Sequence, residues 1–229
     1  MLPLNSPLPA DVMALRDSLP VKPAPITLQG QFVTLIPTDL DRDTEILHHI
    51  SNGSALDING KHVPAYDAEE MIWRFMFNGP FESAEAMRTY MKGQVDAPNG
   101  LPYTVIDNVS GHAVGVINYM NNSPKDLKIE LGSIWYSPIA QRTHANLEST
   151  YLTLKNAFDL GYRRVEWKCN SLNERSRKSA LRMGFLYEGT QEAHMIVKER
   201  NRDTSWFRVL GAEWPSVQPR LEALLAQHR

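Results

Sequence analysis

Alternating and helical patterns of apolar residues follow one another along the chain and predict a mixture of strands and helices. An alternating, β-branched run over residues 32–36 predicts a strand. Thr38 or Asp39 can cap a helix that follows and ends near Ile50. Residues 54–66 show no clear period, so we predict a loop there.

A second helical region comes next, and its apolar residues are rich in methionine and aromatic side chains. A helical stripe covers residues 71–76, Asn78-Gly79-Pro80 interrupts it, and a further helix is predicted over residues 84–95. This stripe is either plain core or the lining of a substrate pocket, and the pattern alone leaves both interpretations open.

The second half of the chain alternates between strand and helix signals. Three strands joined by turns are predicted at residues 103–107, 113–120 and 128–136. A helix over residues 147–158, a strand over 163–169 and a helix over 174–183 follow, the helices ending at Gly161 and Gly184. Two more strands, at 194–198 and 204–210, flank the turn-like Asn201-Arg202-Asp203, and a last helix follows Pro215.

This order of elements predicts a mixed α/β fold with one domain, and the composition agrees with it. The 229 residues are 42% hydrophobic and 22% charged, which is ordinary globular usage. Six of the fifteen prolines lie in residues 1–29, which we expect to form an arm across the core with a short helix at 12–19. We assign residues 30–212 to the domain and 213–229 to a C-terminal helical extension.

Charge, cysteine content and hydropathy exclude several classes of partner. The formal net charge of −2 gives no general field for nucleic acid, so we expect no nucleic-acid partner. Cys169 is the only cysteine, which rules out an intramolecular disulfide and fits the reducing cytoplasm. No stretch approaches the roughly 18 to 20 apolar residues of a membrane helix, and we expect no membrane association.

The sequence also lacks the spacings of several catalytic and metal sites. Among its seven histidines, His48 and His49 are adjacent and so point apart on a helix, and no His-Glu-x-x-His or Cys-x-x-Cys pattern occurs. We therefore expect no metal. A Gly-x-Ser-x-Gly elbow and the phosphate-binding loop of NTPases are likewise absent.

Three short segments carry a resemblance to a known family. They are residues 134–138 (Ile-Trp-Tyr-Ser-Pro), 173–176 (Asn-Glu-Arg-Ser) and 183–185 (Met-Gly-Phe). Together with the element order over residues 30–212, they resemble the GNAT superfamily of N-acetyltransferases, most closely the branch of ribosomal-protein N-terminal acetyltransferases. The resemblance implies a mostly antiparallel, splayed sheet flanked by helices.

The same resemblance implies a function. It implies transfer of an acetyl group from acetyl-CoA, as co-substrate, to a primary amine of a small molecule or a peptide N-terminus, with a homodimer as a possible assembly. A non-catalytic acyl-CoA or ligand-binding module of the same fold is the alternative.

For the donor, the resemblance implies that pantetheine lies along the strand at Trp135 and Tyr136 and that the diphosphate lies at a helix N-terminus. Backbone N–H groups and the helix dipole favour an anion at such a place. The corresponding segment is Gln141-Arg142-Thr143-His144-Ala145-Asn146, in which His144 and Asn146 replace two glycines of the family pattern. Arg142 and Thr143 are candidate phosphate contacts, or else Thr143 is simply the helix cap.

The segment 173–176 matches the family where it contacts pantetheine and the donor sulfur. This implies donor contacts for Asn173 and Ser176, with Ser176 as the group that stabilises the departing thiolate. Alternatively, Asn173 only caps the helix and Ser176 is an exposed first-turn residue. Arg177 belongs to a basic cluster with Arg175, Lys178 and Arg182, which suits nucleotide phosphates or forms a solvated face.

An acetyl acceptor must lose a proton before attack, so a general base is needed. Glu130 is the first candidate, because it faces opposite to Ile129 and Leu131 in its strand. The alternative for Glu130 is pairing with a cation on the sheet. His194 is the second candidate and Glu192 the third.

The acceptor itself is not specified by any pattern. Aromatic residues of the helical pair could form its walls. These candidates are Trp73, Phe77 and Phe81.

Overall fold

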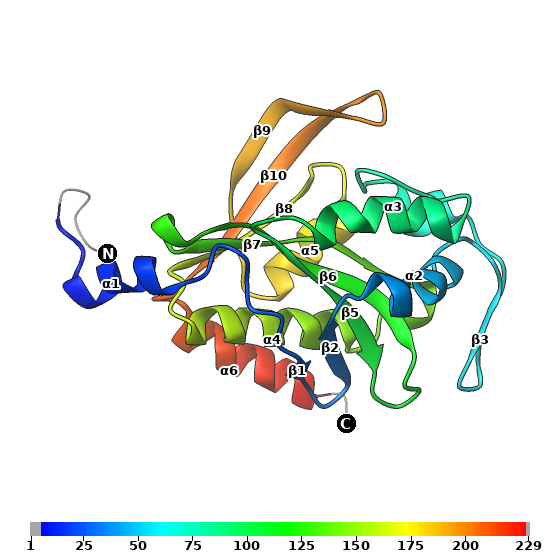
Figure 1. The fold of residues 1–229 in the computed structure, drawn as a ribbon, viewed down its shortest axis with the longest axis horizontal. Helices are drawn as coiled ribbons and strands as arrows, with labels where there is room; N and C mark the ends of the chain where they lie inside the picture. The colour runs from blue at the N-terminus through cyan, green and yellow to red at the C-terminus, as the bar shows by residue number, and fades with distance from the viewer. Residues whose placement is uncertain (1–5, 228–229) are drawn as a thin grey trace.

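The structure, a computed structural model, describes residues 6–227 and consists of one large sheet with helices on both faces (Figure 1). The first elements are α1 (Ala10–Ser18), β1 (Leu28–Gln29), β2 (Val33–Pro37), α2 (Leu40–His49), β3 (Leu56–Ile58), β4 (Lys61–Val63), η1 (Glu69–Trp73) and α3 (Ala84–Val95). They are followed by β5 (Leu101–Asp107), β6 (Ala113–Ser123), η2 (Pro124–Asp126), β7 (Lys128–Tyr136), η3 (Pro138–Ala140) and α4 (Ala145–Asp159). The last elements are β8 (Arg164–Asn170), α5 (Glu174–Arg182), β9 (Leu186–Val197), β10 (Arg200–Leu210) and α6 (Trp214–Ala226).

Eight strands form the sheet in the order β1-β2-β5-β6-β7-β8-β10-β9. The strands β7 and β8 run parallel, joined by the crossover helix α4, and the other neighbouring pairs of this sheet are antiparallel. This mixed, mostly antiparallel α/β architecture confirms the predicted fold class.

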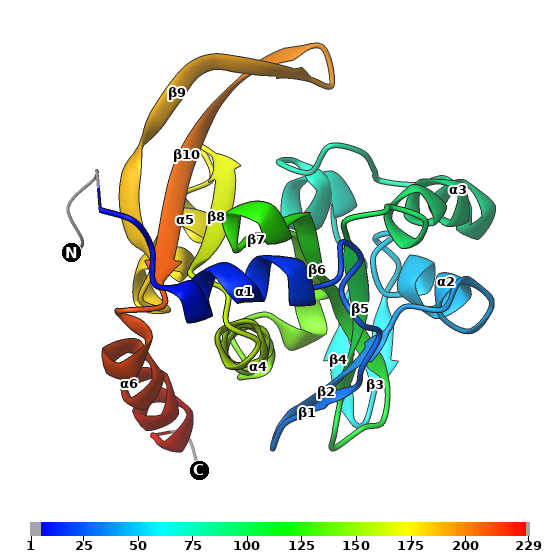
Figure 2. The ribbon, with the colours of Figure 1, turned by 60° about the vertical axis from the view of Figure 1, so that its left-hand side comes forward.

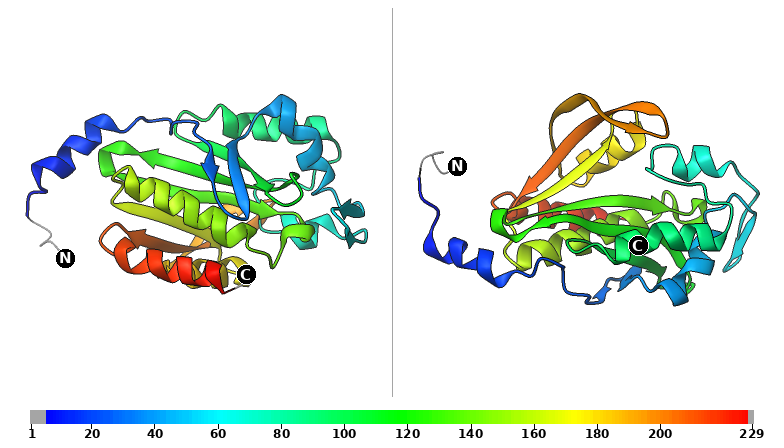
Figure 3. Two further views of the ribbon diagram at one scale, coloured as in Figure 1. Left: turned by 90° about the horizontal axis from the view of Figure 1, so that it is seen from below. Right: turned by 45° about the horizontal axis from the view of Figure 1, so that its top comes forward.

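Helices cover the two faces of the sheet unequally. The helix α4 packs on β2, β5 and β7, with α6 against it, on one face, while α2 and α3 pack together over β5 and β6 (Figure 3). A large apolar cluster lies on the α4 side, and a smaller one, centred on Trp73 and Met87, lies under α2 and α3.

Short side chains fix the helix boundaries as the sequence predicts. The carboxylate of Asp39 accepts from the N–H groups of Asp41 and Arg42 at the start of α2, and Ser83 caps α3. Gly161 and Gly184, with φ of 92° and 89°, follow α4 and α5. Capping therefore sets the lengths of the elements that surround the site.

The sequence predicts a loop for residues 54–66, but the structure has the hairpin β3–β4 there. Asn59 and Gly60 form its two-residue turn, with φ of 50° and 74°. Asn-Gly is the pair that such turns favour, since both central residues need positive φ. The signal was in the sequence, but the strands are only three residues long.

The stripe at residues 71–76 does not form a full helix either. Only Glu69–Trp73 is helical, as one π-helical turn, and Phe75 and Met76 lie in the turns that follow. The predicted pair of helices meeting at Gly79-Pro80 is thus one short turn and α3.

The predicted turn at Asn201-Arg202-Asp203 is wrong, because these residues are paired in β10. The hairpin turns instead at Lys198 and Glu199, whose φ values are 50° and 61°. Neither is a glycine or asparagine, so no turn signal marks them. Consequently β9 and β10 are much longer than predicted.

The β9–β10 hairpin rises from the sheet and arches over it (Figure 2). Its tip is fixed at the far side, where Nζ of Lys198 contacts Oε2 of Glu69 and donates to the carbonyl of Trp73, both at 2.9 Å. The hairpin therefore spans from β8 to the η1 region.

The segment before β2 lies along the edge of the fold. The helix α1 contacts η2, and the carbonyls of Pro20 and Val21 accept from Nδ2 of Asn122 at 2.9 and 2.8 Å. Nζ of Lys22 donates to the carbonyl of Ala97 at 3.0 Å. The predicted arm includes residues 1–5 and the predicted last extension includes residues 228–229, which lie outside the described residues.

Candidate active site

A cleft opens where the parallel strands β7 and β8 separate. Their pairing runs from Lys128↔Arg164 to Leu131↔Trp167 and goes no further. At that point β7 carries a β-bulge, in which Ser133 and Ile134 lie opposite the single residue Ile117 of β6. A bulge bends its strand and strengthens the twist, so β7 turns away from β8.

The bulge is held by its neighbours. Ser133 has a positive φ of 47°, and its carbonyl accepts from Nδ2 of Asn118, a buried residue, at 3.3 Å. Beyond the bulge, Trp135 and Tyr136 still pair with β6, but their other edge faces the gap. An extended chain of amide groups, such as pantetheine, can hydrogen-bond to an unpaired strand edge of this kind.

The cleft between the separated strands has a volume of about 220 Å³. Of the residues singled out from the sequence, five line it: Phe77, Glu130, Asn173, Ser176 and His194. The sequence analysis did not single out Lys168, Cys169, Met195 or Thr204, which also line it, nor Arg202, which it placed in a turn. The structure therefore brings the catalytic candidates Glu130, Ser176 and His194 to one cavity.

Glu130 lies at the floor of the cleft and is 5% exposed. Its Oε2 atom contacts Nζ of Lys168 at 2.6 Å and accepts from Nδ2 of Asn121 at 2.8 Å. Among residues 6–227, Oε1 has no hydrogen bond or ion pair and lies beside Gly132. Glu130 therefore pairs with a cation and also lines the cleft. Its Oε1 atom is available to a ligand.

Ser176 and Asn173 lie on the opposite wall, at the start of α5. Oδ1 of Asn173 accepts from the N–H of Ser176 at 3.1 Å, so Asn173 caps the helix and lines the cleft at once. Oγ of Ser176 accepts from Nε1 of Trp167 at 3.0 Å, which fixes the hydroxyl oxygen and leaves its proton to donate. Burial raises the pKa of the adjacent Cys169 thiol, which is therefore neutral near pH 7.

The other two candidate bases differ in position. Nδ1 of His194 lies 2.9 Å from Oγ1 of Thr204, and the ring lies at the rim of the cleft. Glu192 is exposed and does not line the cleft. Its neighbour Ala193 has a positive φ, which marks an irregularity of β9 at this point.

The connection from β7 to α4 contains the segment expected to hold phosphate. Arg142 is exposed and has a φ of 63°, and Oγ1 of Thr143 donates to the carbonyl of Ala140 at 2.7 Å and accepts from the N–H of Ala145 at 3.2 Å. Thr143 therefore satisfies the first N–H of α4, although the N-cap residue is His144, whose side chain makes no capping hydrogen bond. Nε2 of Gln141 donates to the carbonyl of Tyr136 at 3.2 Å, which joins this segment to the strand.

The residues at the two missing glycines are accommodated differently. The ring of His144 stacks on that of Phe32, the residue before β2, with ring centroids 4.1 Å apart. Oδ1 of Asn146 is buried and has no hydrogen-bond partner within residues 6–227. The first turn of α4 has N–H groups without intrahelical acceptors, so an anion at this helix start remains compatible with the sequence change.

Several predicted contact residues lie outside the cleft. Trp73 is fully buried, donates from Nε1 to the carbonyl of Ser51 at 2.9 Å and packs on Trp135, and Phe81 packs on Trp73. The structure thus places Trp73 and Phe81 in the smaller core cluster. Arg177 is exposed and donates to the carbonyl of Ser171 at 3.3 Å.

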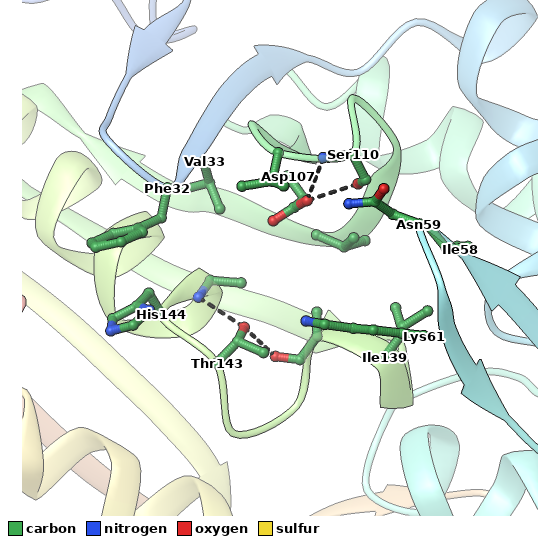
Figure 4. Close-up of a pocket in the computed structure, with 14 residues that line it drawn as sticks. Phe32, Val33, Ile58, Asn59, Lys61, Asp107, Ser110, Ile139, Thr143 and His144 are labelled. Carbon is green, nitrogen blue, oxygen red and sulfur yellow. Dashed lines mark hydrogen bonds between the residues drawn. The ribbon is translucent and has the colours of Figure 1, made fainter. Parts of the chain in front are cut away.

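A second cavity, also of about 220 Å³, lies on the other side of the β7–α4 connection (Figure 4). It is lined mainly by apolar side chains of β2, β3, β6 and η3, together with Thr143 and His144. Lys61 and Asp107 also line it, and Asp107 is satisfied by the N–H and hydroxyl of Ser110 at 2.8 and 2.7 Å. Of its titratable lining residues Lys61, Asp107 and His144, the carboxylate of Asp107 is held by Ser110 and the ring of His144 stacks on Phe32.

No helix within residues 6–227 is long and apolar enough to cross a membrane. In the same residues, no three His, Cys, Asp or Glu side chains gather in a way that could hold a metal ion.

The separated parallel strands and the helix start beyond them are the arrangement that the resemblance implied, and comparison with known proteins specifies the family. The sequence matches the family model of the acetyltransferase (GNAT) domain over residues 55–186. It is 33% identical to a GCN5-related N-acetyltransferase from Brucella melitensis, with a TM-score of 0.79 over 88% of this chain and 86% of that one. The chain belongs to the GNAT acetyltransferase family, whose members transfer an acyl group from acetyl-CoA to an amine.

Other structures agree. A probable GNAT-family acetyltransferase from Chromobacterium violaceum is 32% identical, with a TM-score of 0.79 over 94% of this chain and 98% of that one. An acetyltransferase from Salmonella typhimurium that modifies the N-terminal serine of a 50S ribosomal subunit protein shares the fold, with a TM-score of 0.66 over 81% of this chain and 99% of that one at 15% identity. No curated protein sequence matches the chain.

Proposed function

We propose that this protein acetylates the primary amine of a small molecule or a peptide N-terminus by direct attack of the amine on acetyl-CoA in the β7–β8 cleft. The observation that carries the proposal is the end of β7–β8 pairing at Leu131↔Trp167, next to a buried carboxylate and a hydroxyl. Donor residues on the strand would be Trp135 and Tyr136, through their backbone groups.

The diphosphate of the donor would lie at the start of α4. Arg142 is exposed there, and the N–H groups of residues 144–146 lie in the first turn, where the helix dipole favours an anion. Because Thr143 already caps Ala145, we assign the main contacts to Arg142 and to the remaining N–H groups. Arg177, on the exposed face of α5, would contact the nucleotide end.

Glu130 is our proposed general base. A primary amine with an unperturbed pKa of about 8 or more arrives largely as an ammonium ion, and Oε1 of Glu130 would accept the proton that must leave before attack. The neutral nitrogen then bonds to the thioester carbon, the carbon–sulfur bond breaks, and the second amine proton leaves as the amide forms. That proton balances the charge of the departing thiolate.

Ser176 is our proposed donor to the departing sulfur. Its oxygen is fixed by Trp167, so the hydroxyl proton can point into the cleft. A hydrogen bond to a developing thiolate is charge-assisted and stronger there than in the ground state, which is what lowers a barrier. His194 is the alternative base, since its imidazole lies at the rim of the same cleft.

Calorimetry with acetyl-CoA, followed by a thiol-release assay over a panel of primary amines, tests this function. We expect binding of acetyl-CoA and release of CoA thiol that depends on an amine. Binding without turnover for any amine would favour the non-catalytic module, for which His144 and Asn146 in place of glycines are the motivation. Absence of binding would contradict both functions.

A further inference from the structure

Arg202 is a buried cation at the cleft and has no role in the mechanism above. It lies in β10, lines the cleft and is 6% exposed. Placing a guanidinium in such surroundings is costly unless an anion pairs with it. Burial accordingly lowers the pKa of Arg202 from its usual value.

The described residues offer Arg202 little compensation. Its Nε atom donates to Oγ1 of Thr204 at 3.4 Å, and its guanidinium lies over the ring of Phe77, 4.6 Å from the centroid. No carboxylate within residues 6–227 forms an ion pair with it. By contrast, Arg164 in the neighbouring strand β8 and Arg208 in β10 itself each pair with glutamates.

The charges of the cleft do not cancel. Its ionised lining residues are Glu130, Lys168 and Arg202, and the carboxylate of Glu130 is held by Lys168 at 2.6 Å. Glu130 attracts Arg202 only at longer range. The cleft therefore keeps one positive charge in excess, held on a planar group whose face is covered by Phe77 and whose edge can bind an anion through two parallel hydrogen bonds.

We propose that Arg202 is the recognition site for a carboxylate on the acceptor, so that the substrate is an amine that carries a carboxylate. The assignment rests on the proposed function and adds the substrate class. A carboxylate satisfies Arg202 when the acceptor binds, while the amine of the same molecule lies toward Glu130. The carboxylate is either the terminal one of an amino acid or the side chain of an acidic peptide N-terminus.

Matched acceptors on the wild-type protein test the proposal without any mutation. The first pair is a free amino acid against its α-amide, and the second is a short peptide amide beginning with Ser-Glu against one beginning with Ser-Gln. We expect the carboxylate member of at least one pair to have a kcat/KM higher by about 10- to 100-fold, the range of a charge-assisted hydrogen bond. The pair that responds identifies the source. Equal values in both pairs, with robust turnover, would overturn the carboxylate site and leave the acetyltransferase activity intact.

Variants locate the effect. Arg202→Gln should remove the preference for the carboxylate member by raising its KM, while Arg202→Lys should keep part of it. Arg200→Gln is the matched control, since Arg200 lies in the same strand but is exposed and outside the cleft. A loss of acetyl-CoA affinity in Arg202→Gln would instead assign Arg202 to the donor's phosphates and contradict the proposal.

Product binding separates this proposal from the proposed function, because it needs no turnover. Calorimetry with CoA present compares N-acetylalanine with N-acetylalaninamide, and the α-amide of N-acetyl-Ser-Glu with the α-amide of N-acetyl-Ser-Gln. We expect the carboxylate member of one pair to bind at least tenfold more tightly to wild type and not to Arg202→Gln. Equal binding of both members in both pairs would refute the carboxylate site even if no amine were acetylated.

Discussion

The two cavities beside the β7–α4 connection have the same volume but opposite chemistry. The cleft between β7 and β8 contains Glu130, Lys168 and Arg202, all largely buried, next to a strand edge without a partner. The other cavity is walled by aliphatic and aromatic side chains, and its acidic residue Asp107 is already satisfied by Ser110. Size therefore does not distinguish a site here, whereas the charged side chains gathered in the cleft do.

The difference arises from the strand pairing. At the cleft, the bulge at Ser133 turns β7 away from β8, so that backbone groups of β7 have no pairing partner on that side. The gap between the two strands leaves room for polar side chains. Around the second cavity, the carboxylate of Glu148 accepts from the N–H groups of Gln31, Phe32 and Val33 at 2.8, 2.6 and 2.7 Å. The cleft thus leaves a strand edge open, whereas in the other region Glu148 holds α4 against the start of β2.

The largest expected effect is on the base. Glu130→Gln should lower kcat by about 10²- to 10⁴-fold with little change in acetyl-CoA affinity, because the amide cannot accept the ammonium proton. Steady-state kinetics and calorimetry measure both quantities. Glu192→Gln, an exposed change outside the cleft, is the control and should leave kcat unaltered. A Glu130→Gln protein with wild-type turnover across pH would remove Glu130 from the mechanism and favour His194.

The second effect is on stability and belongs to the other region. Glu148→Ala leaves three backbone donors without their acceptor, which should cost about 3 kcal/mol of unfolding free energy. Urea denaturation followed by tryptophan fluorescence measures it. Glu45→Ala, an exposed change in α2, should stay within about 0.5 kcal/mol of wild type. Similar midpoints for the two variants would show that Glu148 does not hold β2.

The third effect concerns the leaving group. Ser176→Ala should lower kcat by about 10- to 100-fold, the value of a hydrogen bond to a charged group, without a matching change in KM. Ser179→Ala is the control on the same helix, since Ser179 does not line the cleft. Equal turnover in the two variants would reduce Ser176 to a residue of the helix start.

The smallest effect compares the cavities directly. Met195→Trp at the rim of the cleft should raise the KM for the acceptor several-fold by narrowing the entrance, whereas Val109→Trp at the second cavity should leave all constants within about twofold. Both side chains are partly exposed, at 37% and 79%, so the added ring has room outside the core. If Val109→Trp impaired turnover and Met195→Trp did not, the second cavity rather than the cleft would be the acceptor site.

The sequence was sufficient for the element types and for much of the cleft, because alternation, helix caps and the resemblance all depend on local residues. It singled out Glu130, Asn173 and Ser176, which line the cleft, but it could not show that Glu130 pairs with Lys168 in the next strand. That contact depends on the register of two strands far apart in sequence.

The features that the sequence analysis did not predict are a hairpin turn and a strand bulge. The hairpin at Lys198 and Glu199 turns without glycine or asparagine, and the sequence therefore suggested a turn at Arg202 instead. Moving Arg202 from a turn into β10 is what brings it to the cleft. The bulge at Ser133 follows Gly132, and an isolated glycine in a strand pattern suggests a bulge, but serine itself does not predict a positive φ.

A crystal structure of the protein with acetyl-CoA tests the account most directly. We predict pantetheine density along the open edge of residues 134–136, the thioester between Glu130 and Ser176, and the diphosphate at residues 142–146. Density for the pantetheine or the thioester in the other cavity, against Phe32 and Ile139, would contradict the account.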